Sequence, residues 1–190
     1  MSCRAVLLAF IALVLALAGA AVRADGIELT QFQTERTDDA LELSYSTRFE
    51  LSRPAEDALH KGAALYFVAD VTVFRNRWYW RDSRVGHAER VWRLSWQPLT
   101  RQYRVSTGGL HQSFATLTDA LASIRGVSAW PIAEAKELDT DGRYYLEFSF
   151  RLDVSQLPRP LQIGLGSVPG FGLSIEQKRG FNADFSLKAP

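Results

Sequence analysis

Two segments of the sequence alternate almost strictly between apolar and polar residues, and this pattern limits the fold more than any other feature. In residues 41–51 every odd-numbered position is Leu, Tyr, Thr or Phe, and every even-numbered position is Glu, Ser or Arg. Residues 143–153 repeat the alternation, with apolar even-numbered positions from Tyr144 to Leu152. Successive side chains of a β-strand point to opposite faces. The pattern therefore predicts two antiparallel strands, each with one face in a core and one in water.

Shorter patterns predict further strands at residues 27–34, 64–75, 92–96, 101–107, 161–165, 173–177 and 181–187. Residues 64–75 are apolar at odd and even positions alike, which predicts a central strand covered on both sides. In residues 27–34 the apolar phase slips between Leu29 and Phe32, which indicates a β-bulge. The strand at 101–107 is expected to return beside 92–96 and to end at the turn Gly108-Gly109.

Two short helices are expected between the strands. Ser52 is placed to cap a helix from about residue 54 to 61, and Thr116 with Asp119 has the spacing of a capping box for a second helix. The charged fraction of 23% and the aromatic fraction of 12% exclude intrinsic disorder. We therefore expect a mainly β fold, an antiparallel β-sandwich with two short helices, in a single domain over residues 25–190.

Residues 1–24 have the pattern of a secretory signal peptide. Arg4 is followed by the charge-free run 5–22, and small residues lead to an expected cleavage site after Ala24. The alternative is a retained membrane anchor, because the run approaches the length that spans hydrocarbon. The only cysteine, Cys3, precedes the run, so neither lipidation nor a disulfide is expected. The predicted location is the periplasm.

A basic and aromatic stretch is the strongest candidate for a binding surface. Its candidate residues are Arg75, Arg77, Trp78, Trp80, Arg81 and Arg84, and Arg90, Arg93, Arg101 and Arg104 follow within the next twenty positions. Arginines interleaved with aromatic residues bind phosphates, carboxylates or single-stranded nucleic acid. The alternative is that both tryptophans pack inward and the arginines lie on their rings in water. A formal charge of +1 and predicted export make nucleic acid a poor partner.

Signals for a metal, a cofactor or catalysis are weak. His87 and Glu89 share a strand face and offer two metal ligands, but no third ligand is identifiable. Residues 139–142 resemble part of a calcium loop without its later acidic positions, and residues 164–170 lack the spacing of a dinucleotide or nucleophile motif. We therefore expect no cofactor and no enzymatic activity.

Several local motifs together resemble a known family. They lie at residues 65–68, 76–80, 92–94, 97–101, 112–114, 144–145 and 157–162. In these residues the chain resembles an uncharacterised bacterial family, number 4390 among the domains of unknown function. The resemblance implies an exported protein of Gram-negative bacteria with no assigned activity. It also suggests a weak association with a sensor histidine kinase, whose gene lies near those of such proteins, and it assigns no functional residues.

These features are compatible with three functions. The leading hypothesis is a non-enzymatic periplasmic protein that binds an envelope protein or an anionic ligand through the stretch from Arg75 to Arg104. The alternative is a carrier of a small molecule or lipid in the sandwich core, because five Trp and eleven Phe exceed the needs of one packed layer. An envelope hydrolase is supported only by scattered acids and hydroxyls.

Overall fold

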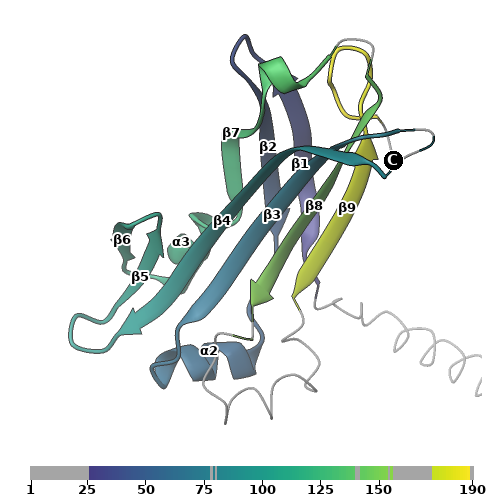
Figure 1. Ribbon diagram of the computed structural model, residues 1–190. Coiled ribbons are helices and arrows are strands. Elements are labelled where there is room, and N and C mark those ends of the chain that lie inside the picture. Colours follow the sequence, from purple (N-terminus) through teal and green to yellow (C-terminus); the bar gives the residue numbers. More distant parts are fainter. Residues whose placement is uncertain are drawn as a thin grey trace, which may run out of the picture.

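Two antiparallel sheets form the part of the chain that the computed structural model describes, residues 26–77, 79, 81–139, 142–153, 155 and 173–188. The smaller sheet has the order β1 (Glu28–Arg36), β2 (Ala40–Arg48) and β7 (Gly126–Glu134). The larger has the order β6 (Leu110–Phe114), β5 (Gln102–Thr107), β4 (Ser83–Gln97), β3 (Leu65–Arg75), β8 (Tyr144–Asp153) and β9 (Ser174–Gly180). The smaller sheet lies behind the larger one (Figure 1), which confirms the mainly β, antiparallel fold.

The core lies between the two sheets, on the faces that the alternation predicts. On β2, Leu41, Leu43 and Tyr45 are buried, and on β8 so are Phe148 and Phe150. The rings of Tyr45 and Phe148 are 4.8 Å apart across the interface, in the tilted arrangement that aromatic pairs favour. One apolar face from each sheet therefore makes the sandwich.

The central position of β3 is confirmed, but its cover is one-sided. The inward residues from Leu65 to Val73 have no exposed surface, whereas on the outer face Val68 is buried and Tyr66 and Phe74 are half-buried. The outer neighbours on β4 and β8 are mostly polar, so water reaches this face. Apolar residues at both odd- and even-numbered positions therefore do not show that both faces of a strand are covered.

β4 is longer than expected, and its two halves have different neighbours. Only Arg93–Gln97 pairs with β5, while the first half of β4 runs beside β7 (Figure 1). Gly86 makes the closest approach, because a Cβ there would lie 2.3 Å from the carbonyl oxygen of Ile132. Farther along β4, the Arg90 guanidinium lies 5.2 Å from the ring centre of Trp130. We call this contact between the first half of β4 and β7 the seam.

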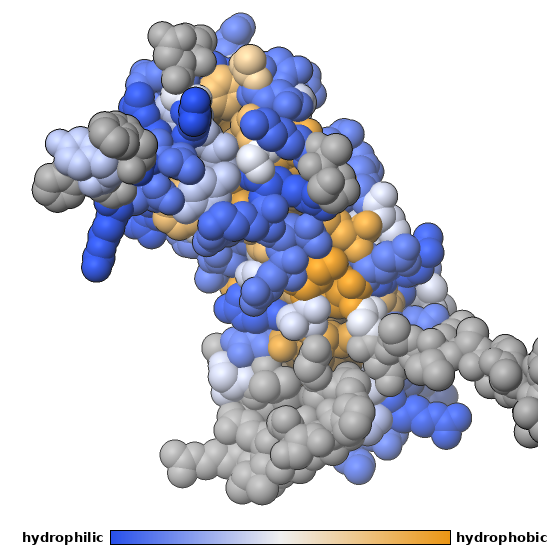
Figure 2. All heavy atoms as spheres, turned by 90° about the vertical axis from the view of Figure 1, so that its right-hand side faces the viewer, coloured by the Kyte–Doolittle hydropathy of each residue, from blue (hydrophilic) through white to orange (hydrophobic). Residues whose placement is uncertain are grey.

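The opposite side of the sandwich, between β1 and β9, is more open. Figure 2 shows a strip of apolar side chains there between hydrophilic ones. Leu29 and Phe32 of β1 and Ile175 of β9 pack on the core without being fully buried. The expected bulge in β1 is confirmed by a register shift between Leu29 and Gln31.

The prediction of a strand at residues 181–187 is wrong. Phe181 and Leu187 form an isolated bridge around a turn in which Phe185 has a φ of 62°. Both Phe181 and Phe185 are buried, and the Thr34 hydroxyl donates to the carbonyl of Phe185 at 2.7 Å. The apolar residues of this tail therefore face the end of the sandwich instead of alternating along a sheet.

Two helices lie where capping residues predict them, α2 (Arg53–His60) and α3 (Leu117–Ala122), and a short 3-10 turn η1 (Ala135–Glu137) follows β7. The Thr116 hydroxyl accepts from the Asp119 backbone N–H at 3.1 Å, which confirms Thr116 as the N-cap, and it donates to the Asp119 carboxylate at 2.6 Å. Ser52 occupies the cap position of α2, but its hydroxyl makes no capping hydrogen bond. Among the described residues no helix is long and apolar enough to cross a membrane. The leader 1–24 and the strand expected at 161–165 lie outside those residues.

Candidate functional site

Residues 75–84, which we call the tip, join β3 to β4 at the end of the sandwich that also carries the C-terminus (Figure 1). Arg75 is the last residue of β3, and its guanidinium lies 2.8 Å from the Asp139 carboxylate. It also lies 5.9 Å from the ring centre of Tyr144. The charge of Arg75 is therefore already paired within the chain, and its side chain supports the tip.

Asp82 ties the tip to β8. Its carboxylate accepts the backbone N–H of Arg77 at 3.1 Å and the hydroxyl of Tyr145 at 2.8 Å. The hydrogen bond from the Arg77 N–H is the main cause that lowers the pKa of Asp82 below its ordinary value, and the hydrogen bond from the Tyr145 hydroxyl is the next. The carboxylate therefore stays ionised near neutral pH and fixes both ends of the connection.

An aromatic pair on the outer face of the sheet lies beside this tie. The rings of Phe74 and Tyr145 stack with centres 5.2 Å apart and planes at 21°. The Lys178 ammonium lies 4.1 Å from the centre of the Tyr145 ring and pairs with Glu147 at 2.8 Å. Burial raises the pKa of the Tyr145 hydroxyl, and its hydrogen bond to Asp82 raises that pKa further, so Tyr145 remains a donor.

Three arginines of the tip have unpaired charges. Arg77, Arg81 and Arg84 are exposed, and none of their guanidiniums makes an ion pair or hydrogen bond with a described residue. We call these three residues the tip arginines. Arg143 is also exposed, and its carbonyl accepts the Asn76 N–H at 2.7 Å beside them. The tip therefore combines fixed supports with positive charge that is available to an external anion.

The aromatic part of the predicted site is only partly described. Tyr79 is 71% exposed. Trp78 and Trp80 lie outside the described residues, so both their binding role and their inward packing stay predictions.

The wider arginine stretch does not form one surface. Arg84 and Arg93 are nine positions apart on a single strand, which places them about 30 Å apart. The Arg93 guanidinium donates to the Tyr66 hydroxyl at 3.2 Å, and Arg101 and Arg104 are exposed on the β4–β5 hairpin, beyond Arg93. Arg90 faces the other way, toward the core, because it pairs in register with the buried Ala69. The expected contact surface from Arg75 to Arg104 is therefore limited to its first part.

The weaker sequence signals also have places in the fold. His87 contacts Asp70 at 3.7 Å and Thr72 at 3.2 Å on the outer sheet face. The described residues contain no group of three or more potential metal ligands. Asp139 belongs to the support of Arg75, and residues 140–141 and 164–170 lie outside the description.

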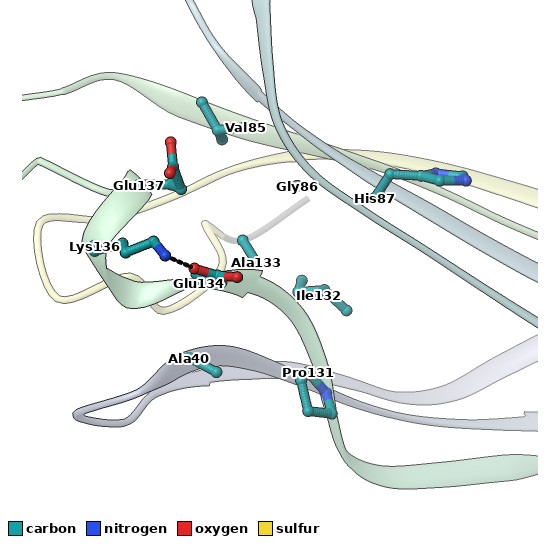
Figure 3. Close-up of a pocket in the computed structure, with 10 residues that line it drawn as sticks. All are labelled: Ala40, Val85, Gly86, His87, Pro131, Ile132, Ala133, Glu134, Lys136 and Glu137. Carbon is teal, nitrogen blue, oxygen red and sulfur yellow. Dashed lines mark ion pairs between the residues drawn. The ribbon is translucent and has the colours of Figure 1, made fainter.

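A depression of about 490 Å³ lies on the seam (Figure 3). Val85 and Gly86 of β4 face Pro131, Ile132 and Ala133 of β7 across it. Its polar lining residues are His87, Glu137 and the ion pair between Glu134 and Lys136. The depression is thus apolar along the strands and charged toward η1.

The sequence did not single out Asp139, Tyr145 or Lys178 as parts of the tip. Tyr145 is the one outward aromatic residue in the alternation of 143–153, which is a signal that could have drawn attention to it. Asp139 and Lys178 come from other segments, and only the pairing of β8 with β3 and β9 brings their neighbourhood to the tip.

Residues 24–179 match the model of a family described as Domain of unknown function (DUF4390). Neither the curated proteins nor the solved structures give a significant match.

Proposed function

The chain belongs to the DUF4390 family, and we propose that it is an exported, non-enzymatic accessory protein whose tip binds an acidic segment of an envelope protein or another anionic ligand. The tip arginines carry this proposal, because three exposed guanidiniums belong to one short connection and have no carboxylate partner among the described residues. Guanidinium groups bind carboxylates and phosphates through two parallel hydrogen bonds.

The contacts that hold the tip in place favour binding, because they reduce the conformational entropy that is lost when a partner binds. Arg75 is held by Asp139, and the Asp82 carboxylate joins the Arg77 backbone to Tyr145. A segment that is fixed before association loses less conformational entropy when a partner binds. Exposed Tyr and Arg side chains are also the residue types that contribute most to binding energy at interfaces.

The chemistry of the tip suits recognition better than catalysis. Arginine stays protonated in proteins and cannot act as a general base, and the Asp82 carboxylate is already occupied by two donors. We therefore propose a binding role with no cofactor.

The proposed location is the periplasm, on the pattern of the leader 1–24. In the periplasm, the partner of the tip is an envelope protein with an acidic exposed segment. The periplasmic region of a sensor histidine kinase is one candidate, on the resemblance alone.

In-cell cross-linking with affinity purification tests the proposal. The tagged wild type is compared with a variant in which the tip arginines are changed to Ser, and with a control variant of equal charge change. Arg53, Arg104 and Arg151 suit the control, because all three are exposed and lie on other segments. We expect an envelope protein to be captured by the wild type and the control but lost from the tip variant.

Capture that weakens equally in both variants would mean that net charge, not the tip, determines binding. Capture that is unchanged in the tip variant would refute the assignment of the surface. The salt dependence of the interaction provides a second measure, since contacts made by exposed charges weaken as ionic strength rises.

A further inference from the structure

Arg90 occupies a position on β4 where an apolar residue is expected. It lies in register with Ala69, and the inward positions on either side of it are Ala88 and the buried Trp92. Its side chain is half-buried and its guanidinium packs on the ring of Trp130 at 5.2 Å. Among the described residues it has no carboxylate partner and no hydrogen bond. A cation on a core-facing position without a counter-ion is unusual, because burial of a charge normally requires a partner.

Tyr45 presents a second unpaired polar group beside the same ring. It is 2% exposed, and its hydroxyl has no hydrogen-bond partner among the described residues. Its ring lies 6.4 Å from that of Trp130, so Trp130 contacts both Tyr45 and Arg90. Buried hydroxyls almost always find a partner, so one without a partner requires an explanation.

The protonation states of Arg90 and Tyr45 favour an anionic hydrogen-bond acceptor beside Trp130. Burial raises the pKa of the Tyr45 hydroxyl well above its ordinary value, and the positive charge of Arg90 opposes this shift. Tyr45 therefore keeps its proton and can donate it in a hydrogen bond. Arg90 and Tyr45 together supply donors of both kinds, charged and neutral, around one apolar ring.

We infer that Arg90, Tyr45 and Trp130 form a binding site on the seam for a carboxylate or phosphate group carried by an apolar chain. The oxyanion would accept hydrogen bonds from the guanidinium and the phenol, and would neutralise Arg90. The Tyr45 hydroxyl is fully buried, so binding requires the side chains around it to move apart, and a small amphiphile requires a smaller opening than the surface of a protein does.

The depression on the seam offers a place for the apolar chain. It lies farther along the seam and is lined by Pro131, the residue after Trp130, and by Val85, Ile132 and Ala133 (Figure 3). Its volume of about 490 Å³ is in the range of small-molecule sites. The site is separate from the tip, since Arg84 and Arg90 are six positions, about 20 Å, apart along β4. It also gives the carrier alternative a specific location, at the seam instead of the middle of the core.

Titration calorimetry with four probes tests the inference: dodecanoate, dodecyl phosphate, 1-dodecanol and inorganic phosphate. We expect dodecanoate or dodecyl phosphate to bind saturably at one site. 1-Dodecanol should bind at least about tenfold more weakly, because it lacks the charge that pairs with Arg90. Inorganic phosphate as tight as dodecyl phosphate would overturn the role of the chain, and no saturable binding of either amphiphilic anion would overturn the site.

Variants locate the binding. Arg90→Met keeps an unbranched apolar side chain and removes the charge, and should weaken the anionic probes at least about tenfold. Arg93→Met is the matched control, because Arg93 lies on the same strand but on the exposed outer face. Tyr45→Phe removes only the unpaired hydroxyl, so it should weaken probe binding without lowering the unfolding midpoint. Probe affinity unchanged by Arg90→Met, or lowered as much by Arg93→Met, would contradict the inference. The tip arginines are intact in every variant, so failure here leaves the proposed function of the tip unaffected.

Discussion

Gly86 determines how closely the two sheets meet at the seam, and its replacement tests this part of the structure. A Cβ at this position would lie 2.3 Å from the Ile132 carbonyl oxygen, 2.6 Å from the Ala133 Cβ and 2.9 Å from the Ala133 Cα. All three are shorter than real contacts, and none belongs to a flexible side chain that could rotate away. Gly86→Ala must therefore push β4 and β7 apart.

The cost follows from two opposing effects. Forcing an extra methyl group into a packed contact costs about 1–3 kcal/mol. Alanine also restricts the unfolded chain, which returns roughly 0.4–1 kcal/mol. We expect a net loss of about 1–2 kcal/mol in the free energy of unfolding, equivalent to a fall of about 2–8 °C in Tm for a chain of this size.

Urea unfolding followed by tryptophan fluorescence measures this loss, and Gly26→Ala is its matched control. Nothing lies within 4 Å of a Cβ built on Gly26, so the same substitution there should leave the unfolding midpoint unchanged or slightly raised. If Gly86→Ala unfolds at the same urea concentration as Gly26→Ala, the close approach of β4 to β7 is refuted. A further variant, Ala133→Gly in the Gly86→Ala background, should recover only part of the loss, because the Ile132 carbonyl still obstructs the new methyl group.

Three other predictions concern the tip and α3. Changing the tip arginines to Ser should shift Tm by no more than about 2 °C, because exposed charges without partners contribute little to stability; a large fall would show that they pack. Tyr145→Phe should raise the pKa of Asp82 toward its ordinary value in an NMR titration. Since folding lowers this pKa, the stability from the Asp82 carboxylate is present above the ordinary pKa and lost as pH falls through the lowered one. Thr116→Ala should cost about 1 kcal/mol in the free energy of unfolding, measured in urea, through loss of the cap of α3, and no loss would contradict the role of Thr116 as the N-cap.

The parts of the fold that the sequence predicted are those whose signals are local. The alternation in β2 and β8 depends only on which face of one strand meets the core. The N-cap at Thr116 depends on two residues three positions apart. Neither requires knowledge of the neighbouring strands, so both could be predicted from residue order alone.

β7 shows why other elements could not be predicted. It contains Pro131 and an Ala129 with a φ of 49°, and its pairing with β2 shifts register twice. Each shift interrupts the period of two, so the apolar residues of β7 do not alternate along the sequence. The first half of β4 could not be predicted from the sequence for a related reason. Gly86 and Arg90 occupy inward positions where large apolar residues are expected.

The candidate site was predictable as a stretch of charge but not as a geometry. Arg75, Arg84 and Arg90 belong to the same basic stretch, yet Asp139 pairs with the first, no described residue pairs with the second, and Trp130 packs on the third. These partners come from segments that approach only in the folded chain. Counting arginines along the sequence therefore could not separate the supporting, free and inward-facing ones.

A single irregularity in β4 is what separates the tip from the seam. Val73 pairs with Gly86 and Phe74 with Arg84, which leaves Val85 as an extra residue without a partner on β3. In a regular strand, residues two positions apart face the same side. Because of the bulge at Val85, Arg84 lies with Phe74 on the outer face, while Gly86 and then Arg90 face inward. One inserted residue thus allows a single strand to present a free cation at the tip and an unpaired cation at the seam, which is why the two proposed sites can be altered independently.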